Sequence, residues 1–194
     1  MKTIQLISAC LILFASCQPS EEKVKPEVKS VEGCSYTRNE TNAAGNMVRV
    51  IEDALFIGLT MDDTTGGTVK TKDYMKGYLS CVSVDSVKGI YFYFKIYSAE
   101  ASRDYGMVKK DNKVSFILAS GKTVSVPFAG TFSGNTNLSQ EFTEYKTFSR
   151  LSGADVDLLK SSELQRVSIS WTKIEEEYKV VNPTIFMKQL PCIE

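Results

Sequence analysis

Apolar and polar residues alternate along much of the chain after residue 34, most clearly over residues 90–97. One face of this segment carries Ile90, Phe92, Phe94 and Ile96, and the other carries Tyr91, Tyr93, Lys95 and Tyr97. A period of two residues is typical of a β-strand with one buried face. The pattern therefore predicts a strand over residues 90–97, with the first set of side chains in the core.

Similar alternating segments, separated by turn residues, predict antiparallel hairpins. Residues 79–84 precede the strand just described across a short loop. Residues 114–118 and 124–128 flank Ser120-Gly121-Lys122 and predict a second hairpin. Pro127 has no N–H to donate, so we expect its strand at the edge of a sheet. Further strands are predicted at residues 47–51, 55–61, 141–149, 164–172 and 174–180.

Two short helices are predicted in the last quarter of the chain. Ser152, followed three residues later by Asp155, is the pattern of an N-cap with its capping-box partner. Asn182 followed by Pro183 predicts a second helix start, because proline is favoured at the first helical position. One face of this short final helix then carries Ile185, Phe186, Gln189 and Leu190.

These elements predict one mainly β, antiparallel domain over residues 34–194. Strands and helices do not alternate regularly, which disfavours a parallel α/β fold. A flattened barrel and a two-sheet sandwich both fit short alternating strands, so both alternatives stay open. Of the two, we expect a barrel-like meander covered by the C-terminal helix.

Residues 1–16 have the pattern of a secretory signal peptide. Their apolar stretch, residues 3–15, is too short to span a bilayer as a helix. It ends in Phe14-Ala15-Ser16-Cys17, which resembles the lipobox of bacterial lipoproteins, where leucine is more usual at the Phe14 position. The resemblance implies cleavage before Cys17 and fatty acylation of its thiol. The alternative is an unmodified cysteine in a secretory segment.

Residues 17–33 are rich in charge and contain two prolines, which predicts a flexible linker behind the lipidated cysteine. Acyl chains contribute about 0.8 kcal/mol per buried CH₂, so Cys17 would anchor the protein in the outer membrane. Ser20-Glu21-Glu22 is similar to the acidic export signal of Bacteroidota-type surface lipoproteins, which implies display on the cell surface. A solvated spacer, with the domain facing the periplasm, is the alternative.

Two stretches of the predicted domain extend the resemblance. Residues 34–42, and residues 151–169 together with the terminal Cys192, are similar to a group of small Bacteroidota-type lipoproteins of unknown function. This resemblance implies a lipidated β domain with a C-terminal cysteine. It implies no catalytic residue.

The cysteines outside the signal peptide predict a single disulfide. If Cys17 carries lipid, Cys34, Cys81 and Cys192 remain in an oxidising compartment. Cys34 and Cys192 stand at the two ends of the predicted domain, and domain termini often lie close together. We therefore favour a bond between these two, with Cys81 as a buried and inert thiol.

The charges of the chain cancel, and histidine is absent. Lys and Arg number 23, as do Asp and Glu. A nucleic-acid partner is not expected, because such proteins carry an excess of positive charge. The lack of histidine removes the commonest general base and most familiar zinc sites.

Carboxylates are the remaining candidates for catalysis or metal binding. Acidic residues cluster at Asp62/Asp63, Glu141/Glu144, Asp155/Asp157 and Glu175/Glu176/Glu177. Each cluster falls in a predicted turn or on a polar strand face, and the acidic turn at residues 62–66 lacks the ligand spacing of a calcium loop. We therefore expect no catalytic residue, no metal site and no cofactor.

The second face of the 90–97 strand carries more aromatic side chains than folding alone requires. Tyr91, Tyr93 and Tyr97, joined by Tyr74 and Tyr78, would form an amphipathic platform for a sugar or a protein if that face is open. If a second sheet or the final helix covers it, the tyrosines belong to the core. We favour the covered arrangement, and we keep Tyr91, Tyr93 and Tyr97 as the candidate ligand-binding residues.

These observations favour a non-enzymatic, membrane-anchored envelope lipoprotein whose β domain binds a protein or glycan, or has a structural role. One alternative is a lipocalin-like carrier with a small apolar ligand inside the barrel. A less favoured alternative is a hydrolase that depends on carboxylates alone.

Overall fold

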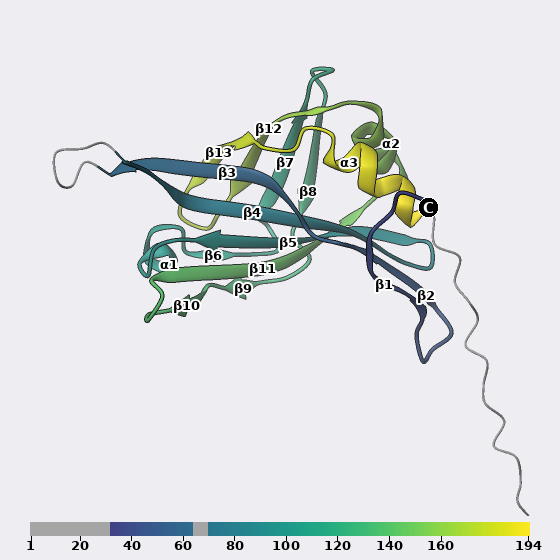
Figure 1. Cartoon of the computed structure of the whole chain (residues 1–194), viewed down its shortest axis with the longest axis horizontal. Coiled ribbons are helices and arrows are strands. Elements are labelled where there is room, and N and C mark those ends of the chain that lie inside the picture. Colours follow the sequence, from purple (N-terminus) through teal and green to yellow (C-terminus); the bar gives the residue numbers. More distant parts are fainter. Residues whose placement is uncertain (1–31, 64–69) are drawn as a thin grey trace, which may run out of the picture.

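The computed structural model describes residues 32–63 and 70–194. These residues form a mainly β structure, in which a curled antiparallel sheet makes a half-barrel and a small second sheet lies beside it (Figure 1). The predicted fold class is therefore confirmed. The predicted signal peptide, lipidation at Cys17, most of the predicted linker and part of the acidic turn at residues 62–66 fall outside the described residues, and these stay predictions.

Thirteen strands and four helical segments make up the described part of the chain. The strands are β1 (Tyr36–Thr41), β2 (Met47–Ile51), β3 (Ala54–Asp63), β4 (Lys70–Val84), β5 (Val87–Ile96), β6 (Met107–Val108), β7 (Lys113–Leu118), β8 (Thr123–Pro127), β9 (Phe132–Ser133), β10 (Asn135–Asn137), β11 (Phe142–Leu151), β12 (Leu164–Ser170) and β13 (Glu175–Val180). The helices are α1 (Ala101–Asp104), α2 (Gly153–Ser161), α3 (Ile185–Gln189) and the 3₁₀ helix η1 (Leu190–Ile193).

The large sheet joins several hairpins through pairs that are distant in sequence. Its strand order is β10-β11-β5-β4-β3-β13-β12-β7-β8, and β2 pairs with both β1 and β4. Only β3, β4 and β5 follow one another as a meander, because β11 returns to pair with β5 and β13 returns to pair with β3. The meander order that we expected is therefore wrong, although the sheet is barrel-like and every pairing is antiparallel.

The sheet curls until its two ends approach each other. Strand β8 is the last in the order, as the proline at its end predicts. Just beyond β8, the backbone N–H of Ala129 donates a hydrogen bond of 2.7 Å to the carbonyl oxygen of Phe148 in β11. This contact brings the β8 end of the sheet against the β11 end.

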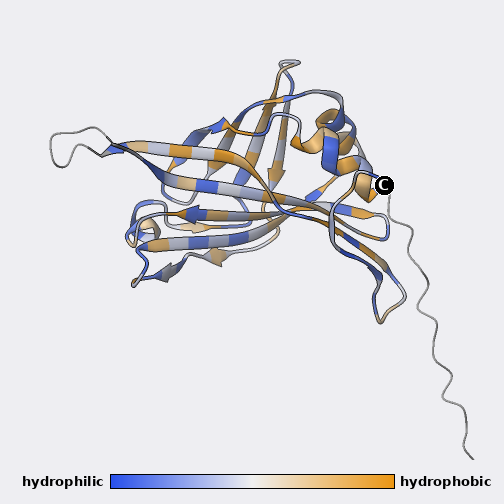
Figure 2. Ribbon diagram, viewed as in Figure 1, coloured by the Kyte–Doolittle hydropathy of each residue, from blue (hydrophilic) through white to orange (hydrophobic). Residues whose placement is uncertain are grey.

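The inside of the curled sheet is an aromatic core. Figure 2 shows polar and apolar residues interrupting one another along the strands, as half-buried strands require. Phe92 lies at the centre, with its ring centroid 5.7 Å from that of Phe94, 6.3 Å from Phe116 and 6.1 Å from Phe128. Each buried aromatic side chain contributes about 1.5–3 kcal/mol of hydrophobic free energy. The inner set predicted for the strand at residues 90–97 is confirmed.

Helices α2 and α3 lie side by side at one end of the half-barrel (Figure 1). The capping box predicted for α2 is present, because the Ser152 hydroxyl accepts from the N–H of Asp155 and the Asp155 carboxylate accepts from the N–H of Ser152. Helix α3 begins at Ile185, two residues later than Pro183, because the Pro183 carbonyl oxygen accepts from the N–H of Leu164 instead. Helix α1 was not predicted.

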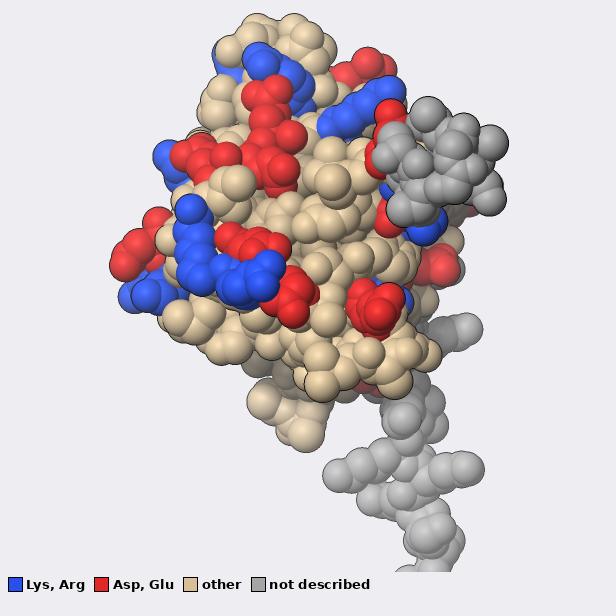
Figure 3. Space-filling model, turned by 90° about the vertical axis from the view of Figure 1, so that its left-hand side faces the viewer, with Lys and Arg blue, Asp and Glu red and all other residues tan. Residues whose placement is uncertain are grey.

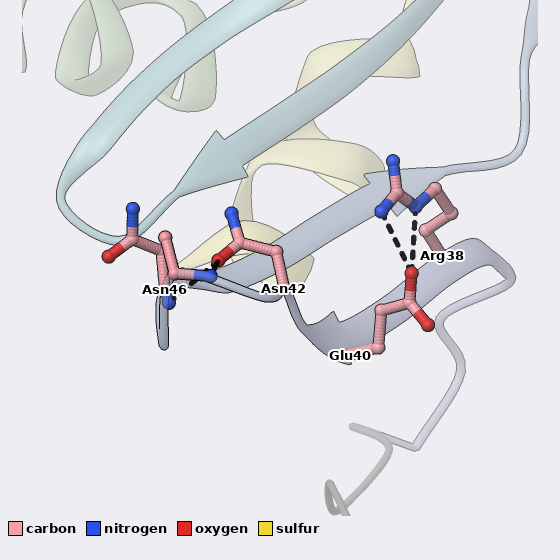
Figure 4. A network of polar contacts seen from close by, with 5 residues as sticks. Arg38, Glu40, Asn42 and Asn46 are labelled. Atoms are coloured by element: carbon pink, nitrogen blue, oxygen red, sulfur yellow. Dashed lines mark hydrogen bonds and ion pairs between the residues drawn. The ribbon is translucent and has the colours of Figure 1, made fainter.

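Strands β1 and β2 form a hairpin that extends the sheet beyond the end of β3. Its turn is closed by Asn42, whose side-chain oxygen accepts from the backbone N–H groups of Ala44 and Asn46, each at 3.0 Å (Figure 4). Arg38 and Glu40 form an exposed ion pair of 2.8 Å along β1. The hairpin therefore has its own local polar contacts as well as its pairing with β4.

Candidate functional site

The tyrosines of β5 lie on the outer face of the sheet, between β4 and β11. Tyr93 stands opposite Tyr78 of β4 and Lys146 of β11, while Tyr91 stands opposite Ser80 and Phe148. Two residues beyond Tyr93 on the same face, Lys95 of β5 stands opposite Lys76 of β4 and Glu144 of β11. The register therefore assembles an aromatic row across three neighbouring strands.

This face is open, which corrects the covered arrangement that we favoured from the sequence. Tyr91 is 52% exposed and Tyr97 is 39% exposed, while Tyr93 is partly buried. The C-terminal helix packs against the inner face instead, where the ring of Phe186 meets that of Phe116 edge-on at 4.8 Å. A covering layer would have to bury the tyrosines, and the helix that we expected to do so lies elsewhere.

A groove of about 630 Å³ runs along the aromatic row. We call it the tyrosine groove, and it is lined by Asp53, Tyr78, Leu79, Ser80, Tyr91, Phe92, Tyr93, Phe132, Lys146 and Thr147. The chain between β8 and β10 contributes Phe132 as one wall. Grooves that bind small molecules are mostly apolar with a few polar groups, and this lining fits that description.

The rings in the tyrosine groove pack in two pairs. Tyr78 and Tyr93 stack, with centroids 5.7 Å apart and planes inclined by 25°. Tyr91 and Phe148 lie 5.0 Å apart with their planes inclined by 51°. The ammonium of Lys146 lies 5.3 Å from the Tyr93 ring, within the range of a cation–π contact. The platform is therefore held in place before a ligand arrives.

Tyr93 is oriented further by a carboxylate. Its phenol donates a hydrogen bond to Oε1 of Glu144 on β11, and Lys146 lies 3.9 Å from the other oxygen of that carboxylate. Burial, together with the nearby Glu144 charge, raises the pKa of the Tyr93 phenol above its ordinary value. The phenol therefore stays protonated and acts as a donor at neutral pH.

A second groove, of about 440 Å³, adjoins the first. We call it the valine groove, and it is lined by Arg38, Asn42, Val48, Val50, Val82, Ser83, Val84, Val87, Tyr91 and Phe148. Its valines come from β2, β4 and β5, which pair in register at this end of the sheet. Tyr91 lines both grooves, so the two meet at its ring.

The structure brings Tyr91 and Tyr93 together but does not place Tyr97 in either groove. Tyr97 follows the end of β5, where the Lys95 ammonium lies 5.5 Å from its ring and 3.8 Å from that of Phe142. Phe148, Phe132 and the valines were missed by sequence reasoning. Phe148 alternates correctly within β11, but no local signal says that β11 lies beside β5.

Cys34 and Cys192 form a disulfide, with Cα atoms 5.8 Å apart, as predicted. The phenol of Tyr36 donates to the carbonyl oxygen of Cys192 at 2.8 Å, so β1 and η1 are also joined by a hydrogen bond. Cys81 is buried, and burial raises the pKa of its thiol well above the ordinary value. A raised pKa suppresses the reactive thiolate, which agrees with the inert role expected for Cys81.

Several of the carboxylates considered for catalysis are used in structural contacts. Asp155 caps α2, Glu175 accepts from Ser168, and Glu177 pairs with Arg166. Glu176 accepts hydrogen bonds from the phenols of Tyr105 and Tyr178. In residues 32–63 and 70–194, no group of three or more Cys, Asp or Glu side chains is arranged to hold a metal ion.

Charged side chains are mixed by sign. Figure 3 shows Lys and Arg among Asp and Glu at one end of the molecule, without a patch of a single sign. Close ion pairs such as Arg103–Glu100, at 2.6 Å, balance the charges locally. No helix in the described part of the chain is long and apolar enough to cross a membrane.

Aromatic side chains pack around Trp171 inside the half-barrel. Trp171 lies inside the half-barrel with the rings of Phe94, Tyr105 and Tyr145 at 5.1–5.4 Å, and its N–H donates to the Tyr178 phenol. A lipocalin-like carrier would hold its ligand in this space. The candidate residues Tyr91 and Tyr93 line grooves on the outer face of the sheet instead.

Comparison with known proteins identifies no relative from which a role could be transferred: no family model, no curated protein and no solved structure matches this chain.

Proposed function

We propose that this protein is a non-enzymatic lipoprotein of the bacterial outer membrane, anchored through Cys17, and that its β domain binds a glycan in the tyrosine groove. The observation that carries the proposal is the open aromatic row. Tyr91 and Phe148 lie beside stacked Tyr78 and Tyr93, in a groove of about 630 Å³. Aromatic side chains with a polar group at one end suit ligands that have both apolar faces and hydroxyls.

The polar groups beside the rings support a glycan. Asp53 and Lys146 line the groove, and Glu144 lies next to Lys146. Carboxylates accept hydrogen bonds from sugar hydroxyls, and an ammonium donates to them. Acidic and basic groups together favour a ligand that is neutral and rich in hydroxyls over a polyanion.

A binding experiment tests the glycan proposal. The mature chain carrying Cys17→Ala, which removes the site of lipidation, is applied to an array of lipid-free bacterial oligosaccharides. We expect selective binding that weakens at least tenfold in Tyr91→Ala, which removes the exposed ring that lines the groove and packs on Phe148. Leu138→Ala is the matched control, because Leu138 is 78% exposed and lines neither groove. Equal binding by wild type and Tyr91→Ala, or no binding, would overturn the proposal.

The anchor is tested separately. Metabolic labelling with a fatty acid is expected to mark the wild type and not Cys17→Ala. Protease treatment of intact cells then distinguishes display on the surface, where the domain is cleaved, from a periplasmic orientation, where it is protected. Equal labelling of both proteins would contradict anchoring through Cys17.

A further inference from the structure

We infer that the natural ligand is a glycolipid, whose sugar lies in the tyrosine groove and whose alkyl chain lies in the valine groove. The inference rests on the proposed glycan-binding function and adds to it the chemical class of the ligand. It follows from the different linings of two grooves that meet at one residue, Tyr91.

The valine groove offers aliphatic side chains to a ligand, and Arg38, Asn42 and Ser83 complete its lining. Five of its lining residues are valines, contributed by neighbouring strands of one sheet face. Val87 is 50% exposed and Val84 is 39% exposed. Covering either side chain with a ligand would remove apolar surface from water, which is favourable. Val84 and Val87 therefore offer exposed apolar side chains that a hydrocarbon chain would cover.

The two grooves are positioned to take one ligand. The Tyr91 ring lines both, and Phe148, which packs on Tyr91, forms part of the valine groove. A ligand that crosses Tyr91 therefore passes from a lining rich in aromatic rings to one rich in aliphatic side chains. An amphiphile with a sugar at one end and an alkyl chain at the other matches that order.

An extended peptide fits this surface less well. The tyrosine groove lies over β4, β5 and β11, and the valine groove lies mainly over β2, β4 and β5. Each of these strands is hydrogen-bonded to neighbours on both sides. A peptide that binds by strand addition needs a free sheet edge, which these strands do not offer. The balance of Lys146 against Glu144 also disfavours a head group with several phosphates.

Alkyl glycosides of increasing chain length test the inference. The probes are the methyl, hexyl and octyl β-glycosides of glucose, galactose, mannose and N-acetylglucosamine, used below their micelle concentrations. Binding to the mature Cys17→Ala chain is measured by calorimetry. For the sugar that binds, we expect affinity to rise about twofold per added methylene, because part of each CH₂ leaves water.

Variants in the two grooves separate the sugar from the chain. Val87→Asp is expected to remove the gain with chain length and to leave the methyl glycoside unaffected. Tyr91→Ala should weaken every glycoside, and Leu138→Asp should weaken none. Thermal unfolding checks that each variant is folded. If Val87→Asp does not fold, Val84→Thr, which keeps the side-chain shape, replaces it in the experiment.

The outcomes distinguish the inference from the function on which it rests. If methyl and octyl glycosides bind equally and both depend on Tyr91, the glycolipid is excluded and the glycan function stands. If octyl sulfobetaine, a chain without sugar, binds as tightly as the octyl glycosides and no methyl glycoside binds, both proposals are wrong. Failure of every glycoside to bind overturns both as well.

Discussion

The ring of Phe148 lies directly over Gly89, with its Cζ atom 2.3 Å from the position that a Cβ on Gly89 would occupy. This glycine in β5 therefore allows Phe148 of β11 to lean across the sheet and meet Tyr91. Gly89→Ala would force the ring away and would also press on the carbonyl oxygen of Ser149, 2.7 Å from the same position. We expect a loss of about 1–3 kcal/mol in unfolding free energy, typical of overpacking, measured by urea denaturation.

Gly153 provides the matched control for that substitution. It is the first residue of α2, and a Cβ there would meet nothing within 4 Å. Gly153→Ala should be neutral or stabilise the protein by up to about 1 kcal/mol, because alanine favours the helix. If both substitutions had the same effect, the close approach of Phe148 to Gly89 would be of no consequence.

The carboxylate of Glu176 links three side chains at one end of the core. It accepts from the phenols of Tyr178, at 2.6 Å, and Tyr105, at 3.0 Å, and Trp171 donates to the Tyr178 phenol. Glu176→Leu would leave both phenols without this acceptor, so we expect a loss of about 2–3 kcal/mol in denaturant titrations. Glu176→Gln, which keeps an acceptor, should lose less.

Glu177, the next residue, is the control for Glu176. Its carboxylate pairs with Arg166 at the surface, where both side chains are about half exposed. Exposed ion pairs contribute little, so Glu177→Gln should change the unfolding free energy by less than about 0.5 kcal/mol. A larger effect at Glu177 than at Glu176 would show that the tyrosine network is not stabilising.

The disulfide closes a loop that spans nearly the whole domain. Cys34 and Cys192 are separated by 158 residues, so reduction, or replacement of both by alanine, should lower stability by up to about 5 kcal/mol. Alkylation with iodoacetamide gives an independent readout in the mature Cys17→Ala chain. We expect no rapid labelling of the native protein, and labelling of Cys81 alone after denaturation without reductant. Labelling of two or three thiols under those conditions would exclude the bond.

The side chain of Glu194 is expected to make the protein slightly less stable at acidic pH than at neutral pH. A hydrogen bond from Lys160 and a contact with Lys88 hold the pKa of the Glu194 side chain below its usual value of 4.5. The folded state thus favours the charged form, and its stabilisation is present above the unfolded pKa and is lost as the pH falls through the folded pKa. The side chain is 41% exposed, so we expect only a few tenths of a kcal/mol.

Thermal unfolding of wild type and Glu194→Gln across the acid range measures this effect. At neutral pH the wild type should melt slightly higher, and the difference should vanish at low pH and shrink in high salt, which screens the pair. A difference that persists unchanged into acid would mean that the charge of Glu194 is not responsible.

Much of the fold is readable from local patterns. Alternation predicts the inner face of β5, Ser152 and Asp155 predict the start of α2, and Pro127 predicts an edge strand. Each of these depends on residues that are neighbours in sequence. The pairing of Cys34 with Cys192 was also predictable, because chain ends of a compact domain tend to meet.

Features that depend on distant contacts were not readable. Glu176 lies on the same face of β13 as the buried Tyr178, and its acceptor role there depends on Tyr105, which follows α1 and is 71 residues away in sequence. Helix α1 has only four residues and no side-chain cap, so it gives no periodic signal. The openness of the tyrosine face likewise depends on where α3 packs, which alternation within β5 does not determine.

The bond between Cys34 and Cys192 also decides how the domain would respond to pulling. Tension on the backbone at Gly33 enters at Cys34, and without the bond it would peel β1 from β2 and then β2 from β4, one hydrogen bond after another. With the bond in place, part of the tension passes through sulfur into η1, whose Leu190 and Ile193 are buried. The hairpin and the C-terminal segment must then yield together, so a tethered domain resists shear at its point of attachment.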